Sequence, residues 1–237
     1  MLQNFNFQDV LFLDIETVPL FSSYDEVPDE YKYFWDRKTE RIKSNEKDSP
    51  ESIYNRAGIY AEFGKIICIS VAIFSGEELR VKSFYSATSE LEILTLFAEL
   101  LNSYYNKQGA ALCAHNGKEF DFPYIARRML INGISLPNIL NIAGKKPWEI
   151  NHYDTMELWK FGDYKNYTSL NLLAYMFNIP SPKDDIDGSM VADVFYKEHN
   201  IERIVKYCEK DVITIVQIMR KYLNQPLISE DKIKIVK

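Results

Sequence analysis

Short apolar runs separated by polar turns predict a set of β-strands in the first half of the chain. Residues 10–15, Lys65–Phe74 and Leu79–Tyr85 are apolar runs of strand length, as expected for strands buried in a sheet. Gly76 lies between the second and third runs, which predicts that they form a hairpin. Ala110–Ala114 is a shorter run of mostly small residues, and we expect it to form a further strand.

From residue 89 onward, apolar positions recur every three or four residues, which predicts helices. The first helix has its apolar positions at Leu91, Leu94, Phe97, Ala98 and Leu101. Further helices are expected at Asp121–Asn132, Ser169–Asn178, Ser189–His199 and Ile201–Leu223. Ser89 and Ser189 are placed to cap the helices that they begin. Residues 134–154 are irregular, with one strand expected to lead into Asp154. This order of elements indicates an α/β fold with a mixed β-sheet flanked by helices.

The segment 21–60 differs from both patterns, because it is charged and rich in aromatic residues. Pro28 suits the first turn of a helix. Phe34, Trp35, Lys38 and Ile42 then fall along one helical stripe. We expect a largely helical insertion within a single domain that spans residues 1–237. The aromatic stripe is expected to pack against its own domain, and stacking on single-stranded bases is the alternative.

Composition and charge limit the kinds of partner. The chain has 237 residues, 46% of them hydrophobic, which is enough for one large domain. Its net charge of −6 gives it no general attraction to nucleic acid. A bound polyanion would need a basic patch or a metal ion. The candidates for such a patch, each of which could also be a solvated surface charge, are Arg127, Arg128, Lys145, Lys146, Lys160 and Lys165.

Cysteine and histidine usage argues against a disulfide framework and against a zinc site. There are three cysteines, an odd number that is typical of reduced buried thiols. The three histidines show no spacing typical of zinc ligands. No apolar run approaches the length needed to span a membrane. These features predict a soluble cytoplasmic protein that does not act at a membrane.

Two carboxylates in the first strand carry the clearest chemical signal. Asp14 and Glu16 interrupt the apolar run Leu11–Thr17. Side chains alternate across a strand, so these two point to one face with Cα atoms roughly 7 Å apart. Buried carboxylates that face each other are unfavourable unless a cation compensates them. Mg²⁺ and Mn²⁺ prefer oxygen ligands, which points to metal-assisted phosphoryl chemistry. The alternative is a strand-end turn or a surface strand.

Two later segments offer further acidic residues. Asp121 follows a predicted strand and begins a predicted helix, where its alternative role is that of an N-cap. Tyr207 and Asp211 are four residues apart on the last predicted helix, so they share one face about 6 Å apart. Their alternative is a solvated pair on an amphipathic helix.

Together these segments resemble the three motifs of the DnaQ-like, or DEDD, superfamily of 3′–5′ exonucleases, which have an RNase H-like fold. The matching residues are Asp14-Ile15-Glu16-Thr17, His115-Asn116 with Phe120-Asp121, and Tyr207 with Asp211. Lys206 stands where the histidine subtype would carry its histidine, which indicates the tyrosine (DEDDy) subtype. The chain most resembles stand-alone predicted 3′–5′ exonucleases that are related to the proofreading domain of family B DNA polymerases.

The resemblance implies a role for each matching residue in a two-metal-ion mechanism with Mg²⁺ or Mn²⁺. Asp14 would bind both ions, Glu16 and Asp211 one of them, and Asp121 the other through water. Tyr207 would orient the attacking water. Four carboxylates can hold two such ions about 3.5–4 Å apart.

The resemblance also implies a substrate. Thr17 and Asn116 would contact the terminal nucleotide, and Phe120 would pack against a base or sugar. The substrate would be the 3′ end of single-stranded DNA or RNA, with DNA favoured, and the products nucleoside 5′-monophosphates. The alternatives are a ribonuclease trimming RNA 3′ ends, a non-catalytic nucleic-acid-binding module, and an endonuclease of the wider RNase H-like group. The sequence identifies no protein partner.

Overall fold

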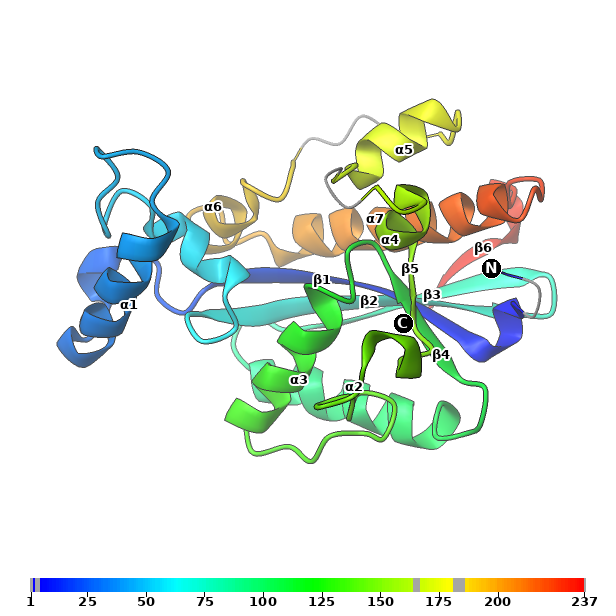
Figure 1. Ribbon diagram of the computed structural model, residues 1–237, viewed down its shortest axis with the longest axis horizontal. Helices are drawn as coiled ribbons and strands as arrows, with labels where there is room; N and C mark the ends of the chain where they lie inside the picture. The colour runs from blue at the N-terminus through cyan, green and yellow to red at the C-terminus, as the bar shows by residue number, and fades with distance from the viewer. Residues whose placement is uncertain (1, 3–4, 164–166, 181–185, 237) are drawn as a thin grey trace.

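A six-stranded mixed sheet forms the centre of the molecule in the computed structural model, which describes residues 2, 5–163, 167–180 and 186–236 (Figure 1). The strands are β1 (Val10–Pro19), β2 (Gly64–Ser75), β3 (Glu78–Tyr85), β4 (Ala111–Ala114), β5 (Tyr153–Asp154) and β6 (Ile233–Val236), in the order β5-β4-β1-β2-β3-β6. The pairs β1–β2 and β2–β3 are antiparallel, and the other three neighbouring pairs are parallel. The predicted α/β class with a mixed sheet is confirmed.

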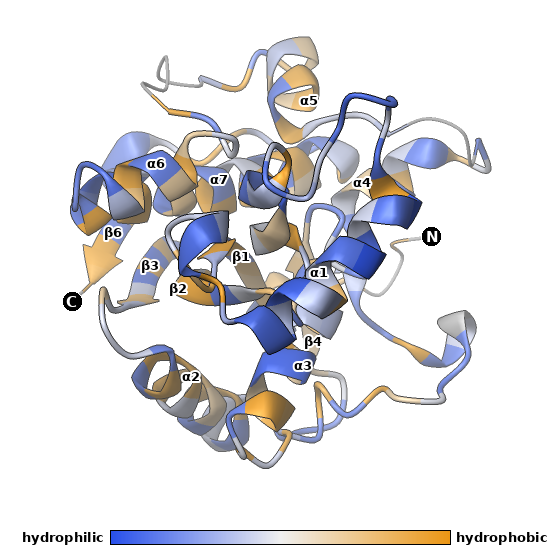
Figure 2. Cartoon of the chain, turned by 90° about the vertical axis from the view of Figure 1, so that its left-hand side faces the viewer, coloured by the Kyte–Doolittle hydropathy of each residue, from blue (hydrophilic) through white to orange (hydrophobic). Residues whose placement is uncertain are grey.

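Helices cover both faces of this sheet. They are α1 (Asp29–Ile42), α2 (Glu90–Tyr104), α3 (Asp121–Ile131), α4 (Thr155–Lys160), α5 (Leu170–Met176), α6 (Val191–Tyr196) and α7 (Ile201–Tyr222). α2 and α3 lie on one face, α4 to α7 lie on the other, and α1 lies at the end toward which β1 runs (Figure 1). Figure 2 looks onto that end and shows α1 in front, with a largely hydrophilic surface. Within the described ranges, no helix has the length and apolar character needed to cross a membrane.

The alternation of side chains along β1 determines where its carboxylates point. Leu11 and Leu13 belong to the core formed with α2 and α3. Val10 and Phe12 belong to a second core that contains residues of α7. Because side chains alternate along a strand, Asp14 and its even-numbered neighbours face α7. The prediction that Asp14 and Glu16 share one face is therefore confirmed.

The structure also departs from the predicted elements. Ser189 does not cap α6, because that helix begins at Val191 and the Ser189 hydroxyl instead donates to Asp187 Oδ1 at 2.5 Å. The short elements α4 and β6 were not predicted. The first has only six residues, and the second is a four-residue, largely exposed strand at the edge of the sheet, so neither has a long apolar pattern.

His152 ties the irregular segment before β5 to β4, and it is expected to make stability depend on pH. Its Nε2 donates to Ile139 O at 2.9 Å, and its Nδ1 accepts from Leu112 N at 3.3 Å. A second proton on Nδ1 would face that N–H, and burial lowers the pKa of His152 to about 4. The unfolded chain, with a pKa near 6.5, therefore binds this proton first.

The contribution of His152 to the free energy of unfolding should therefore be fully present above pH 6.5 and decrease as the pH drops toward 4. For a pKa shift of this size, the free energy of unfolding should decrease by about 3 kcal/mol in total. Urea unfolding at pH 7.5, 5.5 and 4.5 measures it. In His152→Gln, the free energy of unfolding should depend less strongly on pH than in the wild-type protein. An unchanged pH dependence in the variant would assign it to other groups.

Candidate active site

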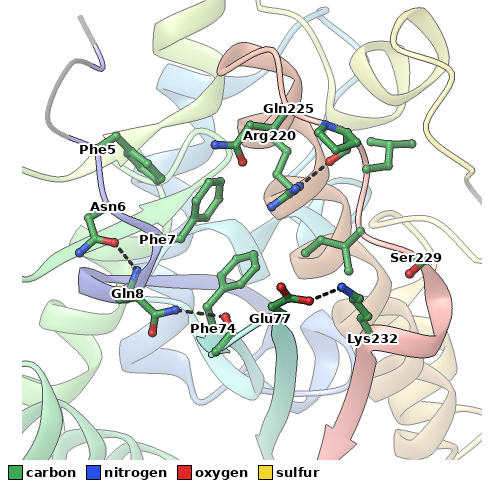
Figure 3. Close-up of a pocket in the computed structure, with 14 residues that line it drawn as sticks. Phe5, Asn6, Phe7, Gln8, Phe74, Glu77, Arg220, Gln225, Ser229 and Lys232 are labelled. Carbon is green, nitrogen blue, oxygen red and sulfur yellow. Dashed lines mark hydrogen bonds and ion pairs between the residues drawn. The ribbon is translucent and has the colours of Figure 1, made fainter.

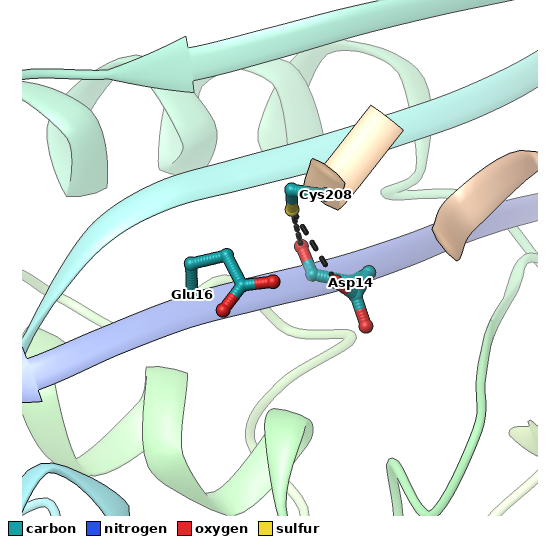
Figure 4. A group of neighbouring side chains, drawn as sticks. All are labelled: Asp14, Glu16 and Cys208. Carbon is teal, nitrogen blue, oxygen red and sulfur yellow. Dashed lines mark hydrogen bonds between the residues drawn. The ribbon is translucent and has the colours of Figure 1, made fainter. Parts of the chain in front are cut away.

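The two carboxylates of β1 lie against a cysteine of α7. One ligand atom from each of Asp14, Glu16 and Cys208 lies within 4.8 Å of the others (Figure 4). The Cys208 thiol lies 3.4 Å from the carbonyl oxygen of Asp14 and 3.3 Å from its Oδ2. Burial raises the pKa of this thiol well above its usual value, so it donates to Asp14 as a neutral group. Glu16 is 7% exposed.

Asp121 reaches the same region from α3. It is the first residue of that helix, and its carboxylate accepts hydrogen bonds from its own N–H and from the N–H of Ile15. β4 pairs only with residues Val10–Phe12 of β1, so the Asp121 carboxylate takes the place of a missing strand partner. The N-cap of α3 is Phe120, which makes no side-chain capping bond. Capping alone therefore does not explain Asp121.

Tyr207 and Asp211 approach from α7, the long helix that packs over this face of β1. The Tyr207 phenol is hydrogen-bonded to the Asp211 carboxylate. Burial, followed by the negative charges of Asp211, Glu16 and Asp14, raises the pKa of Tyr207 far above 10. The prediction that the two residues share one helix is confirmed. They belong to the acidic cluster, and a simple solvated pair is excluded.

The four carboxylates lie close enough for their negative charges to act on one another. Burial and the charges of Asp211, Glu16 and Asp121 raise the pKa of Asp14 well above its usual value. Glu16 is raised in the same way, first by burial and then by Asp211. Burial raises the pKa of Asp121 to about 8. A group of oxygen donors with this much unbalanced negative charge suits hard divalent cations such as Mg²⁺ and Mn²⁺.

Asp154 organises the loop that carries the second motif, a role that the sequence did not reveal. Its Oδ1 accepts from Asn116 N at 2.9 Å, and its Oδ2 accepts from Lys118 N at 3.0 Å. Oδ1 also caps α4 through Met156 N and Glu157 N. Asn116 needs this support because its φ is 63°, in the left-handed region. The only signal in the sequence was an Asp just before a short helix.

Two of the three predicted substrate contacts, Thr17 and Phe120, lie in one hollow with Glu16. This hollow has a volume of about 420 Å³. The side-chain Oδ1 of Asn116 is buried and has no hydrogen-bond partner in the described part of the chain. Buried acceptors are normally satisfied, so this oxygen is suited to bind a donor that enters the site.

Comparison with known proteins fits this arrangement. Residues 59–231 match the family described as "Predicted 3'-5' exonuclease related to the exonuclease domain of PolB". The chain belongs to this family. Of the residues assigned above, Asp121, Tyr207 and Asp211 lie within the matched range, whereas Asp14 and Glu16 precede it. The exonuclease family supports divalent-metal chemistry at the acidic cluster.

One distant sequence relative and one structural neighbour are polymerases. The chain is 21% identical over 191 residues to a DNA polymerase of Pyrococcus glycovorans, covering 73% of this chain and 24% of the polymerase. The family B DNA polymerase of Pyrobaculum calidifontis is similar in structure, with a TM-score of 0.53 and 15% identity over 91% of this chain and 24% of the polymerase. This chain thus spans about a quarter of each polymerase. The structural likeness supports the RNase H-like fold.

Two of the predicted basic candidates that the structure describes are already engaged with acidic side chains. Arg128 is buried in an ion pair with Glu90, with its Nε 2.9 Å from Glu90 Oε1, so its proposed place in a groove was wrong. Lys160 lies 3.9 Å from Glu119. Lys165 lies outside the described residues. Arg127, Lys145 and Lys146 are exposed, and none of them lines the hollow beside Glu16.

A larger hollow of about 570 Å³ lies elsewhere and contains none of the four carboxylates (Figure 3). It is formed by the N-terminal segment, the β2–β3 turn and the chain that follows α7. Its charged groups are engaged with one another and with the backbone: Lys232 pairs with Glu77 at 2.5 Å, and Arg220 donates to Pro226 O at 2.6 Å. The acidic site is therefore not the largest hollow of the molecule.

Close contacts at two glycines, Gly58 and Gly64, hold the insertion against the central sheet, and a side chain at Gly64 should disrupt them. A Cβ at Gly64 would lie 2.3 Å from Tyr124 Oη and 2.6 Å from Gly58 O. Tyr124 itself donates to Gly58 O at 2.8 Å. We expect Gly64→Ala to lower the free energy of unfolding by about 1–3 kcal/mol. Urea unfolding measures this, with Gly188→Ala as the control, because a Cβ at Gly188 meets nothing within 4 Å. Equal stability of both variants would contradict this account.

Proposed function

We propose that this protein is a divalent-metal-dependent 3′–5′ exonuclease that shortens single-stranded DNA from its 3′ end. Residues 1–237 form one exonuclease domain, into which the segment 21–60 is inserted. The observation that carries the proposal is the convergence of Asp14, Glu16, Asp121 and Asp211 with Tyr207 from three elements that are distant in the sequence. Three free buried cysteines support a reducing compartment such as the cytoplasm.

The carboxylates and the tyrosine have separate tasks in this proposal. Asp14, Glu16, Asp121 and Asp211 hold two Mg²⁺ or Mn²⁺ ions. When bound, such ions lower the pKa of water and neutralise charge on the reacting phosphate. Tyr207 keeps its proton because its pKa is raised. Its neutral phenol therefore positions the attacking water without accepting a proton, with Glu16 beside it.

The remaining residues bind and orient the strand. Asn116 offers its unpartnered Oδ1 to a donor on the terminal nucleotide, and the 3′-hydroxyl is such a donor. Thr17 and Phe120 form the wall of the hollow next to Glu16, where Phe120 packs against a base or sugar. Attack on the last phosphodiester then releases the 3′-oxygen of the penultimate nucleotide. The product is a nucleoside 5′-monophosphate.

Linear and circular forms of one single strand test this proposal. With Mg²⁺ or Mn²⁺, the linear DNA strand should lose nucleotides while the circle, which has no 3′ end, stays intact. An RNA strand of the same sequence should be shortened more slowly. Nicking of the circle at a similar rate would identify an endonuclease. Binding of the linear strand with no loss of nucleotides would identify a non-catalytic binding module.

A further inference from the structure

The hollow beside Glu16 is completed by a turn of the insertion. The 3₁₀ turn Tyr54–Ile59 contributes Asn55 and Arg56 to its lining, together with residues of β1 and Phe120. Gly188 and Ser189 line it as well. A hollow of about 420 Å³ is within the usual range for small-molecule sites. The insertion therefore reaches the place where the end of a strand would lie.

Arg56 changes the electrostatics of this hollow. Among the described residues that line it, Arg56 is the only basic one and Glu16 the only acidic one. The side chain of Arg56 is half-buried, and Asn55 beside it is exposed. In the part of the chain that the structure describes, the guanidinium of Arg56 donates one hydrogen bond, from Nη1 to Ile42 O at 3.4 Å. That long bond uses one of its five N–H groups.

Several contacts hold the turn and the chain on either side of it. Tyr124 of α3 donates to Gly58 O at 2.8 Å, and Arg128 of α3 donates to Ala61 O at 2.9 Å. Trp35 of α1 is fully buried and donates to Pro50 O at 2.8 Å. α3 is the helix that begins with Asp121. The same helix therefore positions a catalytic carboxylate and the turn that carries Arg56.

We propose that Arg56 and Asn55 form a phosphate-binding subsite for the backbone of the bound strand near its 3′ end. The guanidinium group matches phosphate geometry through paired N–H donors, and the Asn55 amide can bind the neighbouring sugar or phosphate. In a protein of net negative charge, a local cation beside the metal site adds to the attraction for a polyanion. The inference rests on the proposed function, but the family does not supply it, because the family match begins at residue 59.

Binding and kinetics of Arg56→Ala test the subsite. In Ca²⁺, the affinity for a fluorescent single-stranded DNA 12-mer should fall about tenfold. The slope of log K against log salt should become shallower by about 0.7, the value for one phosphate contact. In Mg²⁺, KM should rise by a similar factor with a much smaller change in kcat. Arg56→Lys should restore the salt slope and only part of the affinity. Arg37→Ala removes an exposed charge from α1 of the same insertion and should leave all of these values unchanged.

The outcomes separate this subsite from the proposed function. If the wild-type protein binds the strand but does not cleave it, the exonuclease proposal fails. The affinities for the fluorescent DNA in Ca²⁺ still show whether Arg56 binds the strand. Wild-type affinity in Arg56→Ala, or an equal loss in Arg37→Ala, overturns the subsite. The subsite is also overturned if Arg56→Ala and Arg56→Lys both have a lower melting temperature than the wild-type protein and bind the strand equally weakly. Arg56 would then act only through its bond to Ile42. A wild-type protein that binds no strand at all overturns the subsite too.

Discussion

Asp14→Asn should lower turnover about 1000-fold while making the metal-free protein more stable, a combination typical of a metal ligand. Activity falls because the amide cannot supply the anionic oxygen that would bind a metal ion. Stability rises because the variant removes one of several negative charges that burial and repulsion oppose. The melting temperature in EDTA should rise by roughly 2–4 °C for each kcal/mol of repulsion removed. Asp211→Ala should abolish turnover and leave the fold intact.

Thermal unfolding in EDTA and in Mn²⁺, together with turnover on single-stranded DNA, measures both effects. Mn²⁺ should raise the melting temperature of the wild-type protein more than that of Asp14→Asn. Asp9→Asn is the matched control, because Asp9 just precedes β1 but is only partly buried and pairs with Lys107 at 2.7 Å. Its turnover should be unchanged, and its stability in EDTA should not rise. Near wild-type turnover in Asp14→Asn would remove Asp14 from the active site.

Asp154→Ala should be the most destabilising of the substitutions considered, although Asp154 binds neither metal nor substrate in this account. The carboxylate is 3% exposed and accepts hydrogen bonds from four backbone N–H groups. Its removal leaves these donors without partners, which we expect to cost about 3–5 kcal/mol. Turnover should fall as well, because Asn116 would lose the bond that holds its left-handed backbone.

Urea unfolding gives the loss of stability, and turnover at saturating substrate gives the loss of positioning. Asp154→Asn retains one acceptor oxygen and should lie between the wild-type protein and Asp154→Ala. Glu157→Ala is the control, since its carboxylate makes an exposed ion pair with Lys118 that should contribute less than about 1 kcal/mol. A loss of stability in Asp154→Ala no larger than in Glu157→Ala would show that the loop does not depend on Asp154.

The fold and the acidic cluster could largely be predicted because their signals are local. The alternation of β1 placed Asp14 and Glu16 on one face, and the helical period placed Tyr207 and Asp211 on another. The structure brings these faces together, since β1 and α7 pack against each other. The exact extent of β1 was not predicted, because its last residues pair with β2 across a bulge between Glu16 and Thr17. The sequence pattern contains no sign of that bulge.

The contacts that complete the site could not be predicted, because they join segments far apart in the chain. Arg56 lies in a short turn of the insertion, and only the folded structure brings it to the hollow beside Glu16. Cys208 was expected only to be a reduced, buried thiol, and its contact with the carboxylate of Asp14 could not be predicted. Arg128 was a candidate for a basic groove, but the structure places it in a buried ion pair with Glu90.

The most direct test of the central claim is the cleavage pattern of a 5′-labelled single-stranded DNA over time, in Mn²⁺ and in EDTA. The account predicts a ladder that shortens one nucleotide at a time from the 3′ end in Mn²⁺. It predicts no cleavage in EDTA, and almost none by Asp14→Asn in Mn²⁺. Cleavage that persists in EDTA, or an equal ladder from Asp14→Asn, would show that the acidic cluster of β1, α3 and α7 does not carry the reaction.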